Sequence, residues 1–130
     1  MKIKTSELDG AELDYAVAKC EEWEVEFEDG PLYFRGDYFR DGDPCKPSTN
    51  WGQGGPIIER EGINIRFITP NASTPQCWAY ISRESDDFNV EGWGYSPLVA
   101  AMRCYVASVW GEEVEVPEEL NIHNQEGVEP

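Results

Sequence analysis

Ten residues near the middle of the chain, WGQGGPIIER from Trp51 to Arg60, combine residue types that bind anions and aromatic rings. Glycines let a backbone approach a ligand closely, and their successive N–H groups can form a nest for an anion. Trp51 offers a stacking surface, and Arg60 offers a planar group that binds phosphate. No lysine follows the glycines, which excludes a phosphate-binding P-loop. The stretch therefore predicts either an anion-binding turn or a plain turn that feeds a strand at 57–60.

Arg103 is the one charge inside an otherwise apolar helical segment, so its guanidinium needs a partner. That partner is either a ligand phosphate or an internal carboxylate, for which the candidates are Glu59, Glu61 and Asp14, unless the side chain instead extends its charged end to water. Trp93 is flanked by glycines and is suited to base stacking, whereas Trp78 lies in an apolar strand and is expected to pack in the core. The predicted ligand-binding residues are Trp51, Gly54, Gly55, Pro56, Arg60, Arg66, Trp93 and Arg103.

No catalytic residue is expected, because the chain has one histidine, His123, no Gly-x-Ser-x-Gly elbow and no cysteine beside a base. The four cysteines lie about thirty residues apart without a Cys-x-x-Cys pair, which favours reduced thiols over a zinc site. Asp86, Asp87 and Glu91 lack the spacing of a cation loop and are expected to form a solvated acidic loop. The sequence therefore predicts a non-enzymatic protein with no metal and no cofactor.

The charge is strongly acidic: 26 Asp and Glu against 10 Lys and Arg give a net charge of −16. Such a surface repels nucleic-acid backbones, so direct DNA or RNA binding is not expected, and it suits a basic partner. The chain has no apolar stretch of membrane length and no signal-like start, which predicts a cytoplasmic protein that does not bind membranes. A homodimer is compatible with these features, since small ligands often bind between subunits.

Two helices are predicted to support these residues, at 9–22 and 96–110. The first has Asp9 and Glu12 at capping-box spacing, and the second has Ser96 as its N-cap and Gly111 past its end. Apolar residues cover most sides of the second helix, which is therefore expected to be buried.

Short apolar or alternating runs predict strands at 23–27, 32–34, 57–60, 63–68 and 77–81. In the fourth of these runs, Ile63, Ile65 and Phe67 are expected to share one face. Segments 36–55 and 83–95 read as loops. The fold class is therefore α+β: one domain over 1–120, with an antiparallel sheet and two helices packed on it, followed by an acidic tail at 121–130.

Three stretches carry a family resemblance: MKIKTSELDGAELDYAVAKC at the start, WGQGGPIIEREGI in the middle, and SPLVAAMRCYVAS followed by GEEVEVP near the end. On these motifs the chain, from Met1 to about Leu120, resembles the NinX-like family of small proteins from tailed phages and prophages. The resemblance implies a phage accessory protein made in the bacterial cytoplasm. It implies no mechanism and carries over no catalytic residue.

Three functions compete, and the third in rank is a structural or regulatory phage component without an immune role. The first is sequestration of a small ligand, most of all a nucleotide signal of bacterial immunity, with arginines on its phosphate and tryptophan on its base. The second is an acidic inhibitor of a basic or nucleic-acid-binding host protein, with strong salt dependence.

Overall fold

Three helices form the centre of the molecule in the computed structural model, which describes residues 1–27, 31–36, 39–68, 76–82 and 89–121. The helices are α1 (Gly10–Glu21), α2 (Trp51–Glu61) and α3 (Pro97–Trp110). The strands are β1 (Lys2–Lys4), β2 (Glu24–Phe27), β3 (Leu32–Arg35), β4 (Asn64–Ile68), β5 (Gln76–Ser82), β6 (Asn89–Gly94) and β7 (Glu113–Glu115), and two 3-10 turns are η1 (Thr5–Glu7) and η2 (Glu118–Asn121). The α+β class is confirmed.

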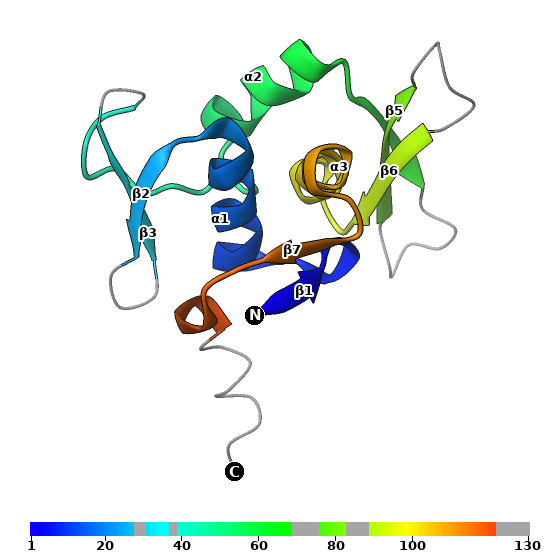
Figure 1. Ribbon diagram of the computed structural model, residues 1–130. Coiled ribbons are helices and arrows are strands. Elements are labelled where there is room, and N and C mark those ends of the chain that lie inside the picture. Colours follow the sequence, from blue (N-terminus) through cyan, green and yellow to red (C-terminus); the bar gives the residue numbers. More distant parts are fainter. Residues whose placement is uncertain (28–30, 37–38, 69–75, 83–88, 122–130) are drawn as a thin grey trace.

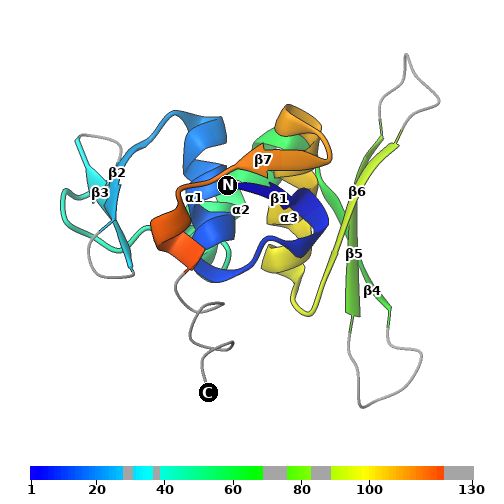
Figure 2. The same ribbon diagram turned by 60° about the horizontal axis from the view of Figure 1, so that its bottom comes forward.

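The strands form three small antiparallel sheets, so the prediction of one sheet was wrong. β2 and β3 make a hairpin on one side of the helices, and β4, β5 and β6 make a sheet on the other side (Figure 1). β1 and β7 pair across the helices and join segments far apart in the sequence (Figure 2). β1 and β7 were missed because three-residue strands leave too short an alternation to read.

Helices α1 and α3 lie where the sequence placed them. Ser96 caps α3 by accepting a hydrogen bond from the Val99 N–H at 3.1 Å, and Gly111 follows the last turn with φ 85°. Asp9 stands at the N-cap of α1, but its side chain makes no capping bond there, so the predicted capping box was wrong. α3 is buried along most of its length, as its apolar composition predicted.

The stretch from Trp51 to Arg60 belongs to α2, so both the predicted glycine turn and the strand at 57–60 were wrong. Asn50 caps the helix by accepting from the Gln53 N–H at 3.2 Å, and Gly62 ends it in the left-handed region. Tertiary packing overrides the low helix propensity of the glycines. A Cβ on Gly54 would lie 2.5 Å from the Pro47 carbonyl oxygen and 2.7 Å from Leu98, so glycine is required there for close approach. The predicted loop at 36–55 therefore ends at Asn50.

β6 was also missed, because 83–95 was expected to be a loop, whereas Asn89–Gly94 is a strand. Gly92 and Gly94 face α3, and a Cβ on Gly92 would lie 2.5 Å from the backbone nitrogen of Cys104. The two glycines let the strand lie directly on the helix backbone. β5 is the central strand of this sheet, with β4 and β6 at its edges.

One face of the three-stranded sheet packs on α3, and no element of the described chain covers the other face (Figure 2). Phe67 was predicted to share one face with Ile63 and Ile65, and the register agrees: Ile65 pairs with Ala79 and Phe67 with Cys77, so both lie on the α3 side. The Phe67 side chain is nevertheless 72% exposed. Phe67 is exposed because α3 lies mainly along β5 and β6, and the end of β4 projects beyond it.

Asp86, Asp87 and the predicted tail beyond Asn121 lie outside the described residues. Among the helices that are described, none combines the length and apolarity needed to cross a bilayer.

Candidate functional site

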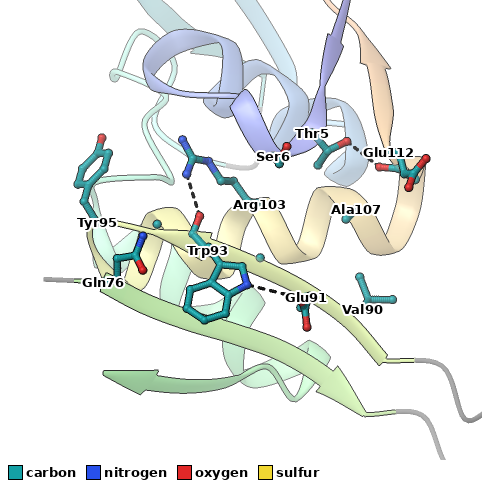
Figure 3. A pocket seen from close by; sticks show the side chains of 13 residues that line it. Thr5, Ser6, Gln76, Val90, Glu91, Trp93, Tyr95, Arg103, Ala107 and Glu112 are labelled. Carbon is teal, nitrogen blue, oxygen red and sulfur yellow. Dashed lines mark hydrogen bonds between the residues drawn. The ribbon is translucent and has the colours of Figure 1, made fainter. Parts of the chain in front are cut away.

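A groove of about 720 Å³ runs along the free edge of β6, above α3 and below η1 (Figure 3). Its walls come from segments far apart in the sequence: Thr5 and Ser6 of η1, β6 from Val90 to Gly94, and Gly111 and Glu112 after α3. Arg103 and Ala107 of α3 line it as well. The volume lies within the usual range for sites that hold small molecules.

Arg103 is half-buried in this groove and held by backbone carbonyls. Its Nε donates to the Leu8 carbonyl at 2.8 Å, and its Nη1 donates to the Trp93 carbonyl at 2.8 Å. The predicted internal carboxylate is therefore not its partner: Glu61 binds Arg60, and Asp14 accepts from Ser48. Within the part of the chain that the structure describes, no carboxylate forms an ion pair with Arg103, and its Nη2 makes no hydrogen bond.

Two exposed aromatic residues border the groove near Arg103. The side chain of Tyr95 is 59% exposed, and its hydroxyl donates to Asp9 at 2.9 Å. Partial burial and this hydrogen bond raise the pKa of the Tyr95 hydroxyl. The Trp93 side chain is 41% exposed and its ring stacks on Trp78, with 6.0 Å between ring centroids. A planar ligand at this end of the groove would thus meet aromatic surface beside a fixed guanidinium.

The charges of the groove are separated along its length. Tyr95, Gln76 and Arg103 lie toward one end, whereas Glu91 and Glu112 lie toward the other (Figure 3). The groove can therefore take a ligand that is anionic at one end and rich in hydrogen-bond donors at the other.

Trp93 and Arg103 are the two predicted site residues that the structure brings together in this groove. Trp51, Gly54, Gly55 and Pro56 lie on α2, away from the groove lining. The Gly54 N–H donates to the Asn50 carbonyl at 2.9 Å within the helix start, so it is not available for an anion nest.

Arg60 lies at the end of α2 and binds acids of the chain itself. Its Nη1 and Nη2 donate to the two carboxylate oxygens of Glu21 at 3.0 and 2.5 Å, and its Nε donates to Glu61 at 2.8 Å. The Tyr105 hydroxyl also donates to Glu21. Burial would raise the pKa of Glu21, but these hydrogen bonds from Arg60 and Tyr105 bring it below its ordinary value. Arg60 therefore joins α2 to α1.

Arg66 stands on the uncovered face of the sheet, opposite Trp78 in the strand register. Trp78 was expected to be a core residue; it is half-buried on that same face and stacks on Tyr80 at 4.5 Å. Neither Trp78 nor Tyr95 was among the predicted site residues. The alternation in Cys77-Trp78-Ala79-Tyr80-Ile81 carried the signal for Trp78, because it puts the two aromatic residues on one face and the three non-aromatic residues on the other.

The four cysteines are all free, and three of them are buried. Burial raises the pKa of Cys20, Cys45 and Cys104 to about 12, so these thiols stay protonated at neutral pH and are poor nucleophiles. Among the described side chains, no three of His, Cys, Asp or Glu gather in a way that would hold a metal ion.

Comparison with known proteins gives one family. Residues 4–109 match the family described as bacteriophage P22, NinX. No curated protein matches the chain.

Proposed function

The chain belongs to the family of bacteriophage P22 NinX, and we propose that it is a non-enzymatic phage accessory protein that binds and sequesters a small nucleotide. The proposal rests on one observation, the state of Arg103. In a chain with 26 acids, this guanidinium is fixed by two carbonyls and has no carboxylate partner in the described residues. A fixed guanidinium with spare donors is a receptor for phosphate.

The groove accommodates the rest of a nucleotide. The phosphate lies at Nη2 of Arg103, and the base stacks against Tyr95 or Trp93, a contact that contributes about 1–3 kcal/mol per base. Ribose hydroxyls and an exocyclic amine are donors, and they reach the acidic end formed by Glu91 and Glu112. A single phosphate group suits this site better than a polyphosphate, because the acidic end would repel further charge.

Retention of the ligand is the whole activity in this proposal. The thiols are protonated at neutral pH, and the described residues that line the groove include no histidine, lysine or cysteine. A bound nucleotide would leave unchanged and would only be removed from the host's solution. In the cytoplasm of an infected bacterium, that removal would silence an immune signal made of nucleotides.

The test is direct binding of defined nucleotides. The purified chain is denatured and the supernatant is examined for material absorbing near 260 nm; the refolded chain is then titrated calorimetrically with linear and cyclic mononucleotides and a cyclic dinucleotide. Arg103→Gln is expected to weaken binding at least about tenfold, the effect of losing one charge-assisted phosphate contact. Arg40→Gln is the matched control, because Arg40 is exposed and outside the groove.

Two results would refute the proposal. One is the absence of heat and of thermal stabilisation with every nucleotide in the panel. The other is a nucleotide that binds Arg103→Gln as tightly as the unmodified chain while both remain folded, since the groove would then not be its site.

The second candidate, an acidic inhibitor of a basic host protein, is favoured by Glu91 and Glu112 in the groove walls. An extended basic segment beside the free edge of β6 would meet both carboxylates. If this second function is correct, Glu112→Gln is expected to weaken binding of the basic protein. Added salt is expected to weaken that binding further. Under the nucleotide proposal, Glu112→Gln leaves the affinity for inorganic phosphate equal or higher, because phosphate contacts Arg103 and lacks the donors that reach Glu112.

A further inference from the structure

The uncovered face of the three-stranded sheet carries a stack of aromatic rings. Trp78 and Tyr80 of the central strand stack at 4.5 Å, and Trp93 of β6 stacks on Trp78 at 6.0 Å. Glu91 accepts from the indole nitrogens of both tryptophans, each at 3.3 Å. These contacts hold the rings in fixed positions on a face that no described element covers (Figure 2). A flat, rigid aromatic surface of this kind is typical of an interface.

The charge on this face differs from that on the rest of the molecule. Strand alternation places Arg66 of β4 and Glu91 of β6 on it, and among the described side chains of this face they are the only charged ones. The face is therefore neutral in a chain whose net charge is −16. Arg66 lies on one edge strand and Glu91 on the other, with Trp78 and Tyr80 of the central strand between them.

We infer that a second copy of this chain packs on this face, sheet against sheet, about a two-fold axis parallel to β5. Such an axis lays β4 of one copy over β6 of the other. Arg66 of each copy then reaches Glu91 and the Trp93 ring of its partner, twice in the dimer. Trp78 and Tyr80 of the two copies meet at the centre, out of water.

The charge of the chain and of this face favours a second copy over a basic protein or a nucleic acid as the partner. Two chains of −16 repel each other over most of their surface, so they can approach only through a neutral, self-complementary face. A basic protein would be drawn instead to the acidic surfaces. A nucleic acid would gain one arginine on this face against the field of the whole chain.

This inference does not depend on the proposed nucleotide site, although Trp93 and Glu91 border both surfaces. The groove is lined by α3 and η1 as well as by β6, and Arg103 takes no part in the sheet contact. A monomeric variant that still binds nucleotide would separate the two ideas, and so would a dimer that binds none.

The test is charge reversal followed by recombination, read by sedimentation equilibrium of the full chain. At about 100 µM the unmodified chain is expected at twice its 14.7 kDa mass. Arg66→Glu and Glu91→Arg each put like charges across the axis, so each is expected to raise the dimer dissociation constant at least about tenfold. Mixed one to one, the two variants are expected to recover the dimer, because every cross-pair is again opposite in sign. Arg40→Glu, an exposed reversal elsewhere, is expected to leave the dimer intact.

Glu91→Arg also removes two indole hydrogen bonds, so circular dichroism checks its fold, and Tyr80→Glu provides a second variant. Tyr80→Glu buries a carboxylate at the centre of the contact and is expected to give monomers. The inference is overturned by an unmodified chain that is monomeric at about 100 µM. It is equally overturned by folded Arg66→Glu or Tyr80→Glu variants that remain dimeric, or by a mixture of folded charge variants that stays monomeric.

Discussion

Asp14 on α1 is a buried carboxylate that we expect to weaken the fold at neutral pH, and one substitution tests this. Its side chain is 6% exposed, and Oδ1 accepts from the Ser48 N–H at 2.8 Å. Burial raises its pKa from 3.8 to about 6, although the hydrogen bonds from Ser48 act in the opposite direction. Asp14→Asn keeps an oxygen acceptor for the Ser48 N–H and removes the buried charge.

The magnitude follows from linkage between proton binding and folding. Because the pKa is higher in the folded chain than in the unfolded chain, the folded state holds the proton longer, and stability falls as the pH rises from 3.8 to about 6. A difference of about two units at about 1.4 kcal/mol per unit is about 3 kcal/mol. Asp14→Asn is therefore expected to stabilise the fold by up to about 3 kcal/mol at pH 7.5 and by less than about 0.5 kcal/mol at pH 3.5.

The assay is urea unfolding of both chains across this pH range, with the slope against urea checked for equality. Asp43→Asn is the control, since Asp43 is exposed, and it is expected to change little at either pH. An Asp14→Asn variant that is less stable than the unmodified chain at pH 7.5 would refute the reasoning. So would a gain that does not depend on pH, because the burial of charge would then not be its cause.

Four further substitutions test the packing around the groove and α2, each by urea unfolding. Gly92→Ala is expected to destabilise the fold by about 1–3 kcal/mol, because its Cβ would strike the backbone of α3. Gly55→Ala, whose Cβ would lie 3.8 Å from its nearest neighbour, is expected to stabilise the fold by up to about 1 kcal/mol. Equal effects of the two substitutions would contradict the close approach of β6 to α3. Asn50→Ala is expected to cost about 1 kcal/mol through loss of the α2 cap, and no loss would mean that the cap is idle. Arg60→Ala is expected to cost about 1–3 kcal/mol at pH 7, a loss that shrinks as the pH falls through the lowered pKa of Glu21; a loss that stays constant with pH would rule out the ion pair.

The sequence predicts α1 and α3 well, because in each helix the periodic apolar residues span the same segment that the residues at its two ends mark out. α2 escapes prediction because Gly52, Gly54, Gly55 and Pro56 all disfavour a helix. The sequence does contain the residues that mark the ends of α2: Asn50, which caps its start at Gln53, and Gly62 at its end. The glycines and the proline between them led to the prediction of a turn instead. Gly54 makes sense only once Pro47 and Leu98 are known to lie against it, which is information from the tertiary structure.

The groove is harder to predict than the helices, since its residues come from both ends of the chain. Arg103 was predicted to need a partner. Its partners are the backbone carbonyls of Leu8 and Trp93, and the amino-acid sequence cannot indicate them because every residue has a carbonyl. The Gly-Trp-Gly sequence around Trp93 did carry a legible signal. Glycines at alternate positions of a strand indicate one face lying on another backbone, which sends the tryptophan to the opposite face.

The pairing of β1 with β7 delays completion of the fold during synthesis. The Thr5 hydroxyl, just past β1, donates to the Gly111 carbonyl 106 residues later in the sequence. At ordinary translation rates about 5–20 s separate the emergence of these two segments. Throughout that interval Ile3 lacks its pairing partner Val114, and Thr5, which lines the groove, lacks its hydrogen bond to Gly111. A nascent chain therefore cannot close the groove until β7 has left the ribosome.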